Sequence, residues 1–246
     1  MDHKSQLNLS EYTRTQRSIE ITSILVFLFI SIRHILGIIK VDSHQNLFVI
    51  ISAVIAGLFL ADFISGVVHW SADTWGSTDW PIVGQSLIRS FREHHVDQKA
   101  ITRHDFIETN GNNCLISLPI LFSLYFVHLD SASKATLFFF VLTISLTSFI
   151  FLTNQFHKWS HEDKVPDIIQ WLQKSHLILP KNHHDYHHVF PYTSNYCITN
   201  GWMNPLLSRV HFFPRLESMI TRLTGAEPRK NDLALVEQSL KSQITG

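Results

Sequence analysis

Charged residues are scarce in this sequence of 246 residues, and the few that are present balance one another. Asp, Glu, Lys and Arg make up 16% of the chain, with 20 basic against 20 acidic side chains. Soluble domains usually carry about a quarter of charged residues. Because the chain has no basic excess, the composition argues against nucleic acid as a partner.

Cysteine is rarer still, with only Cys114 and Cys197. Two cysteines cannot build a disulfide framework, so nothing in the sequence implies an oxidising compartment. A structural zinc site is also disfavoured, because such sites prefer cysteine ligands. The sequence contains no P-loop, no G-x-S-x-G motif and no G-x-G-x-x-G motif, so the enzyme classes that these motifs mark are unsupported.

Apolar residues, by contrast, gather in four long runs at 19–39, 47–68, 114–129 and 135–152. About 20 apolar residues are needed to cross a hydrocarbon core of about 30 Å. The third run is short and contains Pro119, which can kink a membrane helix without excluding it. A signal peptide is the alternative for the first run, but no A-x-A-like site follows it. The pattern predicts an all-α, multi-pass membrane bundle of four spans.

These runs divide the chain into three parts. A polar amino tail covers 1–18, and the four-span membrane region covers 19–155 and includes a polar loop at 69–113. A histidine-rich cap and carboxyl tail cover 156–246. Within the cap, residues 165–179 predict an amphipathic helix, which either lies in the membrane interface or packs on the protein. A second amphipathic helix is expected over 232–240.

Basic residues lie almost entirely on one side of this arrangement. With four spans, the amino tail, the loop at 69–113 and the chain from 155 onward share a side, which holds 17 of the 20 Lys and Arg residues. The turns on the other side hold Lys40 and Lys134, and Arg33 lies within the first run. The positive-inside rule therefore places the tails and the loop in the cytosol.

Histidine is the residue in excess, with 16 in the chain. Seven of them lie between residues 154 and 188: His157, His161, His176, His183, His184, His187 and His188. His157 and His161 are four residues apart, as are His184 and His188, and such a spacing places two side chains on one face of a helix. Neutral imidazole is the commonest nitrogen ligand of transition metals. The two pairs predict two walls of one metal site rather than solvated surface histidines.

Four more histidines, His69, His94, His95 and His104, fall in the loop on the same predicted side. Eleven histidines are too many for one metal but suit two metals with some outer partners. Carboxylates can orient ligand rings through the second ring nitrogen. The candidates for that role are Asp73, Glu93, Asp105 and Asp185, although an acid of this kind is more often a solvated loop charge.

Asp62 lies inside the second apolar run. An acid within a membrane span indicates a functional site by default. The alternative is a carboxylate near the interface that water can reach, and the sequence does not decide between the two.

The position of the histidines, where spans end, suggests the chemistry. A lipid bound there would keep its head in water and its chain along the bundle. Two irons can activate dioxygen and remove hydrogen from an unactivated CH₂ group, which no side chain can do unaided. We therefore expect desaturation or hydroxylation of a lipid chain. A zinc-dependent hydrolase or a metal transporter would also gather histidines, but a transporter should carry polar ligands within its spans.

Six segments of the sequence resemble the plasmanylethanolamine desaturase family, also called the Kua family. They read GVVHWSADTWGS, PIVGQSLIRSFREHH, AITRHDFIETNGNNCL, NQFHKWSH, LPKNHHDYHH and YCITNGWMNPLL. The likeness extends from about residue 61 to residue 229. Plant relatives that desaturate palmitate on phosphatidylglycerol share the histidine layout, but REHH, ITRHDFIETNG and LTGAEPR resemble the plasmanyl branch more. The amino tail is shorter than in animal relatives.

The resemblance implies an oxygen-dependent di-iron enzyme that converts the sn-1 O-alkyl chain of a plasmanyl ethanolamine phospholipid to the vinyl ether of a plasmalogen. Electrons would come from NAD(P)H through cytochrome b5 or a bacterial equivalent. The site would face the cytosol, at the endoplasmic reticulum membrane of a eukaryote or the inner membrane of a bacterium. A fatty-acyl desaturase or hydroxylase, and a non-catalytic metal-binding or transport protein, are the alternatives.

The resemblance also implies a set of ligands. The metal ligands would be His69, His94, His95, His104, His157, His161, His184, His187 and His188. His176 and His183 match family positions without a clear role, and together with Asp73 and Asp185 they are candidates for the surrounding shell.

Overall fold

The structure is a computed structural model that describes residues 12–41, 43–75, 80, 91, 94–95, 97–129, 133–189 and 192–228. Every regular element in these ranges is a helix, and none is a strand. The predicted all-α class is therefore confirmed.

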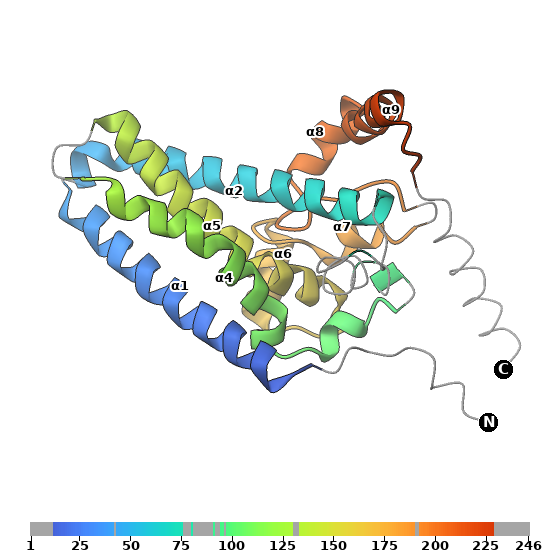
Figure 1. The fold of residues 1–246 in the computed structure, drawn as a ribbon, viewed down its shortest axis with the longest axis horizontal. Coiled ribbons are helices and arrows are strands. Elements are labelled where there is room, and N and C mark those ends of the chain that lie inside the picture. The colour runs from blue at the N-terminus through green and yellow to red at the C-terminus, as the bar shows by residue number, and fades with distance from the viewer. Residues whose placement is uncertain are drawn as a thin grey trace, which may run out of the picture.

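Four helices form an elongated bundle (Figure 1). They are α1 (Arg14–Lys40), α2 (Ser43–Thr74), α4 (Phe106–Ser123) and α5 (Lys134–His161). α4 packs against α1 and α5, and α2 packs against α5. Three of them, α1, α2 from Gln45 onward, and α5, are long and apolar enough to cross a membrane. α4 has 18 residues and continues into the short η4 (Leu124–Phe126), so a fourth span is compatible with the bundle but stays a prediction.

The remaining elements gather at one end of the bundle and form a cap (Figure 1). They are η3 (Ala100–Arg103), α6 (Asp167–Lys174), α7 (Lys181–Asp185), α8 (Met203–Arg209) and α9 (Phe212–Thr224). α1 begins at this end, and α2 and α5 finish there (Figure 1). The bundle therefore brings 69–75, 94–104 and 157–188 together, as the predicted topology requires.

Polar side chains fix where three of the bundle helices begin. Thr13 Oγ1 accepts the N–H of Gln16 at 3.1 Å before α1, and Ser133 Oγ accepts the N–H of Thr136 at 3.1 Å before α5. Asp105 Oδ1 accepts two N–H groups at the start of α4, both at 3.0 Å. Such caps satisfy backbone donors that a helix leaves free at its first turn.

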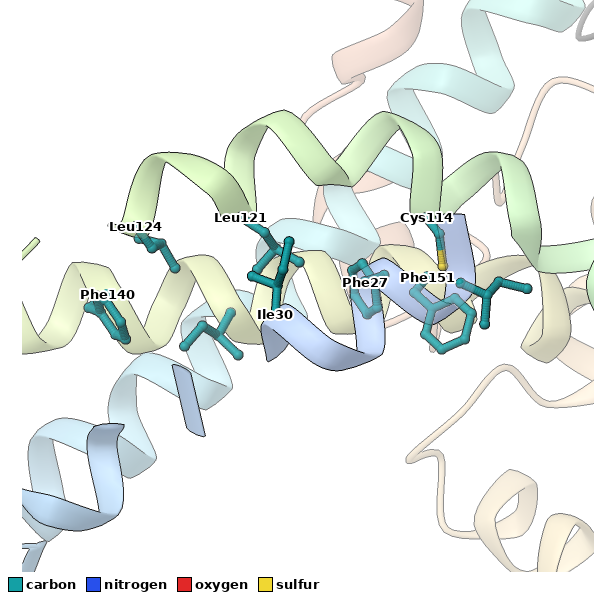
Figure 2. Close-up of a cluster of buried hydrophobic side chains, with 9 residues drawn as sticks. Phe27, Ile30, Cys114, Leu121, Leu124, Phe140 and Phe151 are labelled. Carbon is teal, nitrogen blue, oxygen red and sulfur yellow. The ribbon is translucent and has the colours of Figure 1, made fainter. Parts of the chain in front are cut away.

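The bundle has an aromatic and aliphatic core between α1, α4 and α5 (Figure 2). The rings of Phe27 and Phe151 meet there with their centroids 5.1 Å apart. The outer surface is just as apolar, with Leu25 62%, Phe48 84% and Ile116 69% exposed. Large apolar side chains at such exposure are costly in water but fit the hydrocarbon of a bilayer.

The two predicted amphipathic helices have different outcomes. The segment 165–179 contains α6, with Ile169 buried and with Ile168 and Trp171 61% and 56% exposed. The apolar side of this helix is therefore partly packed on the protein and partly exposed, and its position in the membrane interface stays a prediction. The helix expected over 232–240 lies outside the described residues.

Candidate metal centre

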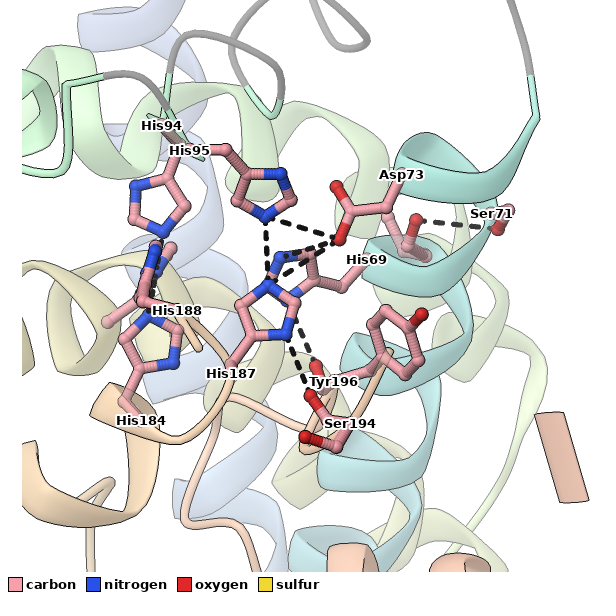
Figure 3. A network of polar contacts seen from close by, with 12 residues as sticks. His69, Ser71, Asp73, His94, His95, His184, His187, His188, Ser194 and Tyr196 are labelled. Carbon is pink, nitrogen blue, oxygen red and sulfur yellow. Dashed lines mark hydrogen bonds and ion pairs between the residues drawn. The ribbon is translucent and has the colours of Figure 1, made fainter. Parts of the chain in front are cut away.

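Two groups of donor atoms meet at the cap end of the bundle (Figure 3). The first, here called the five-histidine group, consists of His94, His157, His161, His184 and His188. The second, here called the mixed group, consists of His69, Asp73, His95 and His187. The eight histidines are among the ligands that the family resemblance implies, whereas Asp73 was expected only as an outer partner, and the role of each residue as a ligand stays a prediction.

Helical spacing positions four of the nine donors. His157 and His161 lie in the last two turns of α5, and His69 and Asp73 share a face in the last turns of α2. α7 contributes His184, and the turn that follows it contributes His187 and His188. Two candidate spans, the short helix α7 and segments far apart in sequence therefore supply one site.

The five-histidine group converges on one point. His157 Nε2 lies 3.0 Å from His94 Nε2, 2.9 Å from His184 Nε2 and 3.2 Å from His161 Nε2. Two nitrogens bound at right angles to one ion, with metal–nitrogen bonds of about 2.1 Å, would lie about 3.0 Å apart. Neutral imidazole nitrogens in such a cluster cannot all hydrogen-bond to one another. The arrangement therefore fits a cation better than a hydrogen-bonded network.

The mixed group differs because it contains a carboxylate. His95 Nε2 and His187 Nε2 are 3.0 Å apart, and Asp73 Oδ2 lies 3.5 Å from His187 Nε2 and 3.3 Å from His69 Nε2. His69 Nε2 is fully buried and has no hydrogen-bond partner among the described residues. A buried lone pair beside a carboxylate fits a metal ion, and nitrogen with oxygen is a donor set that iron accepts.

Backbone carbonyls fix which ring nitrogen faces the mixed group. His69 Nδ1–H donates to the carbonyl of Tyr196 at 3.1 Å, and His187 Nδ1–H donates to the carbonyl of Ser194 at 2.8 Å. Each bond leaves the lone pair on Nε2, which points at the centre. The predicted orienting partners were carboxylates, so these two carbonyls are additions from the structure.

Burial favours the neutral form of three donor histidines. It lowers the pKa of His94 and His184 well below the ordinary value, and neighbouring histidines add to the effect. Burial also lowers the pKa of His187 to about 4. These rings therefore offer lone pairs, not charges, at neutral pH, as ligation requires.

Each His–His doublet divides between the two groups. His94 belongs to the five-histidine group and His95 to the mixed group, and His188 and His187 divide in the same way. The rings of His187 and His188 are 5.3 Å apart at their centroids, and those of His94 and His95 are 6.0 Å apart. The two groups are therefore adjacent, which supports a two-metal centre.

Asp62 turns out to anchor the cap. Its Oδ1 accepts the N–H groups of Thr199, Asn200 and Gly201, each at 3.0 Å, and its Oδ2 accepts that of Met203 at 2.9 Å. The carboxylate is fully buried. Neither sequence interpretation of Asp62, a functional acid or a residue reached by water, anticipated this structural role.

Further polar contacts brace the same loop and the segment after His95. Asn204 Oδ1 accepts the N–H of Cys197 at 2.8 Å, and its Nδ2 donates to the carbonyl of Cys197 at 2.9 Å. Lys99 Nζ donates to the carbonyl of His161 at 2.7 Å, and Lys158 Nζ donates to the carbonyl of His104 at 2.6 Å. These two hydrogen bonds link the segment 99–104, which follows His94 and His95 in the sequence, to α5.

The structure does not bring the other predicted residues to either group. The side chain of His104 is 41% exposed, and its Nε2 lies 3.7 Å from Glu108. It directly follows η3 and belongs to neither donor group. His176 and Asp185 are exposed, and the Nε2 of His183 accepts from Asn204 at 3.0 Å. Asp105 caps α4, and Glu93 lies outside the described residues.

Comparison with known proteins identifies relatives of this chain. The profile of the lipid desaturase domain matches residues 58–231. A plasmanylethanolamine desaturase of Myxococcus xanthus is 46% identical over 93% of this chain and 80% of its own. Plasmanylethanolamine desaturase 1 of Mus musculus is 44% identical over 90% of this chain and 83% of its own.

A plant relative is more distant. The chloroplastic fatty acid desaturase 4 of Arabidopsis thaliana is 36% identical over 71% of this chain and 52% of its own. No solved structure matches the chain. The matched segment contains every donor of both groups, and on these grounds the chain belongs to the lipid desaturase family.

Proposed function

We propose that this chain is a plasmanylethanolamine desaturase, which converts the sn-1 O-alkyl chain of a plasmanyl ethanolamine phospholipid to the vinyl ether of a plasmalogen. The main support is the pair of adjacent donor groups at the end of an apolar bundle. Relatives named for this activity, 46% and 44% identical over most of the chain, point to the substrate.

The proposed reaction needs dioxygen and an electron donor. One dioxygen takes two hydrogen atoms from adjacent chain carbons, together with two electrons and two protons from the donor. The products are one C=C bond and two water molecules. Two irons held by the five-histidine and mixed groups would supply this redox chemistry, which side chains alone cannot.

The chain's own residues would hold and orient the metals. Eight Nε2 lone pairs and the Asp73 carboxylate form the proposed ligand set. The carbonyls of Tyr196 and Ser194 fix two of the rings. Because His69, His184 and His187 are fully buried, bulk water is kept away from their side of the centre.

The membrane side and the partner are part of the proposal. The excess of Lys and Arg at the cap end supports a cytosolic site. The membrane would be the endoplasmic reticulum in a eukaryote and the inner membrane in a bacterium. Cytochrome b5 or a bacterial equivalent would deliver electrons to the cap. The tail at 1–18, the membrane region at 19–155 and the cap at 156–246 remain the proposed divisions.

The alternatives differ in their support. A fatty-acyl desaturase or hydroxylase is favoured by the Arabidopsis relative, which is named as a fatty acid desaturase. A metal transporter is disfavoured because the donors lie at the end of the described spans, and because backbone N–H groups occupy Asp62.

Lipid analysis in a host that makes no vinyl ethers tests the proposal. Cells expressing the full chain are fed an alkylglycerol or a labelled fatty acid, and the lipids are identified by mass spectrometry. We expect vinyl-ether ethanolamine lipids only with the alkyl precursor and only in oxygen. The His187→Ala variant should lose the product, whereas His128→Ala, at the opposite end of the bundle, should keep it. Products from the acyl precursor alone would instead support the acyl desaturase.

A further inference from the structure

An apolar strip runs along the outer faces of α8 and α9. Trp202, Leu206 and Val210 recur every four residues, so they share one face of α8, and they are 37%, 55% and 42% exposed. Met219 and Leu223 recur in the same way on α9 and are 50% and 77% exposed. We call these five residues the apolar strip. Because α8 packs against α9, these five exposed side chains lie on neighbouring helices rather than as scattered single positions.

The strip continues the lipid-facing surface of α2. The ring of Trp202 meets that of Phe59 with the centroids 5.4 Å apart. Phe59 is 38% exposed and shares its helix face with Ile55, which is 47% exposed. Because these α2 residues belong to a candidate span, the strip begins where the protein already contacts hydrocarbon.

The depth of α8 matches the edge of the bilayer. Counting about 20 residues from Gln45 places the end of the hydrocarbon core near residue 65. Asp62 holds the N–H of Met203 at 2.9 Å, which fixes the start of α8 at that level. Figure 1 shows α9 strongly foreshortened beside the full length of α2, so its axis crosses the direction of the spans. A helix with that orientation lies along a membrane surface rather than through it.

Two arginines border the strip on α9. Arg215 and Arg222 line a surface groove together with Ser218, Met219 and Leu223. Guanidinium groups bind phosphate oxygens with two hydrogen bonds, and the aliphatic stem of arginine lies well along apolar surface. Cations beside exposed apolar residues are the pattern of helices that lie among phospholipid headgroups.

The inner face of α9 packs behind the metal centre. Trp70 Nε1–H donates to Glu217 Oε1 at 2.7 Å, and the ring of Phe213 lies 5.5 Å from that of Trp70. Phe213 also meets Tyr196, whose carbonyl orients His69, with the ring centroids 4.9 Å apart. The position of α9 in the membrane would therefore set the height of the mixed group above the hydrocarbon.

We propose that α8 and α9 form a membrane-surface hairpin, in which the apolar strip enters the edge of the hydrocarbon and Arg215 and Arg222 bind the phosphates of phospholipid headgroups. The occupant of this face is the bilayer that holds the spans. A second copy of the chain, or another protein, is the outcome that the test must exclude.

The depth of α9 in the membrane can be measured from the accessibility of spin labels to oxygen and to a nickel chelate. Both native cysteines are buried, so a nitroxide can be attached to Met219→Cys or Leu223→Cys of the full chain in phosphatidylcholine vesicles. Oxygen concentrates in hydrocarbon, and a neutral nickel chelate stays in water. We expect the oxygen-to-nickel ratio at both labels to lie between that of Leu25→Cys, in the exposed face of α1, and that of Lys164→Cys, on the exposed cap.

Two results would overturn the proposal. Ratios equal to that of Lys164→Cys would place α9 in water, and low accessibility to both reagents would place it against protein. Spin–spin broadening at high protein density would identify a second copy. As a test of the arginines, the double change Arg215→Gln and Arg222→Gln should shift the Leu223→Cys label toward water, and Lys174→Gln should not. An unchanged ratio would exclude the phosphate contacts.

Discussion

At the residue scale, the carboxylate of Asp73 sets the mixed group apart from its neighbour. It lies within 3.3–3.6 Å of three imidazole nitrogens, and it is the one acid in either donor group among the described residues. Asp73→Asn preserves size but removes the charge. We expect this variant to bind about half as much metal per chain as the wild type, with vinyl-ether formation abolished, since metal sites need their charged donors.

Metal content by mass spectrometry of the purified protein checks this prediction. His104→Ala is the matched comparison, because the ring of His104 lies outside both groups. We expect it to retain the full metal content. Equal loss of metal in both variants would restore His104 to the ligand set that the sequence implied.

Asp62 gives a second prediction at this scale. Its carboxylate satisfies four backbone N–H groups in the interior. Because hydrogen bonds to a charged group contribute about 1.5–3 kcal/mol each and a buried unmatched donor is costly, Asp62→Asn should destabilise the protein by about 3 kcal/mol. Thermal unfolding of the purified protein in detergent would show it. Asp185→Asn, at an exposed acid, should leave the midpoint unchanged, and a similar midpoint for both would refute the anchoring role.

Single residues also show the limits of sequence reasoning. The spacing of His157 with His161 was readable because a helix repeats every 3.6 residues. The hydrogen bonds from His187 and His69 to the carbonyls of Ser194 and Tyr196 could not be predicted, because every residue has a carbonyl and only the tertiary structure decides which one is used. Asp62 stood out as an acid in an apolar run, but its four backbone N–H partners could not be predicted, because any residue can supply an N–H group.

At the element scale, close helix contacts make the bundle sensitive to small added volumes. A Cβ at Gly57 would lie 2.7 Å from Ser145 Cβ and 3.0 Å from Leu146 N, where α2 meets α5. Backbone cannot yield as a flexible side chain can, so Gly57→Ala should cost about 1–3 kcal/mol. A lower thermal midpoint in detergent is the expected observation.

Gly37 supplies the control for this change. A Cβ there would meet nothing closer than Leu129 Cδ1 at 3.7 Å. Gly37→Ala should therefore be neutral or slightly stabilising, by about 0.5 kcal/mol, because alanine favours a helix. If Gly57→Ala were equally harmless, the helices would be less tightly packed than the distances indicate.

The sequence predicted some helices correctly and missed others. Length and hydropathy located three helices that can cross a membrane, because burial in lipid leaves a strong compositional mark. The third apolar run gave a weaker signal, and α4 starts at Phe106, eight residues before that run, since Asp105 caps it. α8 and α9 escaped prediction because short amphipathic helices resemble polar loops in composition.

At the scale of the whole molecule, metal ions would join the cap to the bundle. The donors come from α2, α5, α7 and the segment at 94–95, so bound ions cross-link parts far apart in sequence. A ligand that binds only the folded state, at a concentration 1,000 times its Kd, adds about 4 kcal/mol to stability. We expect a chelator to lower the thermal midpoint and to speed hydrogen exchange in 181–201.

Hydrogen exchange with mass spectrometry would show where that loss falls. The core between α1 and α4 should keep its protection, because Phe27 and Leu121 pack there away from the donors. Uniform loss of protection through the bundle would mean that the ions support the whole fold rather than the cap. The topology that gathers the donors was readable from sequence, but the division into two groups was not, because it depends on ring directions.

The two histidine doublets have a consequence for how the gene can change. One peptide link joins the five-histidine group to the mixed group at residues 94–95 and again at 187–188, and consecutive Cα atoms across a trans peptide are about 3.8 Å apart. Codons can be gained or lost in the surface loops without altering that interval. A codon inserted inside either doublet would separate its two histidines and displace one donor group relative to the other. Insertions between the two histidines of a doublet should therefore abolish activity.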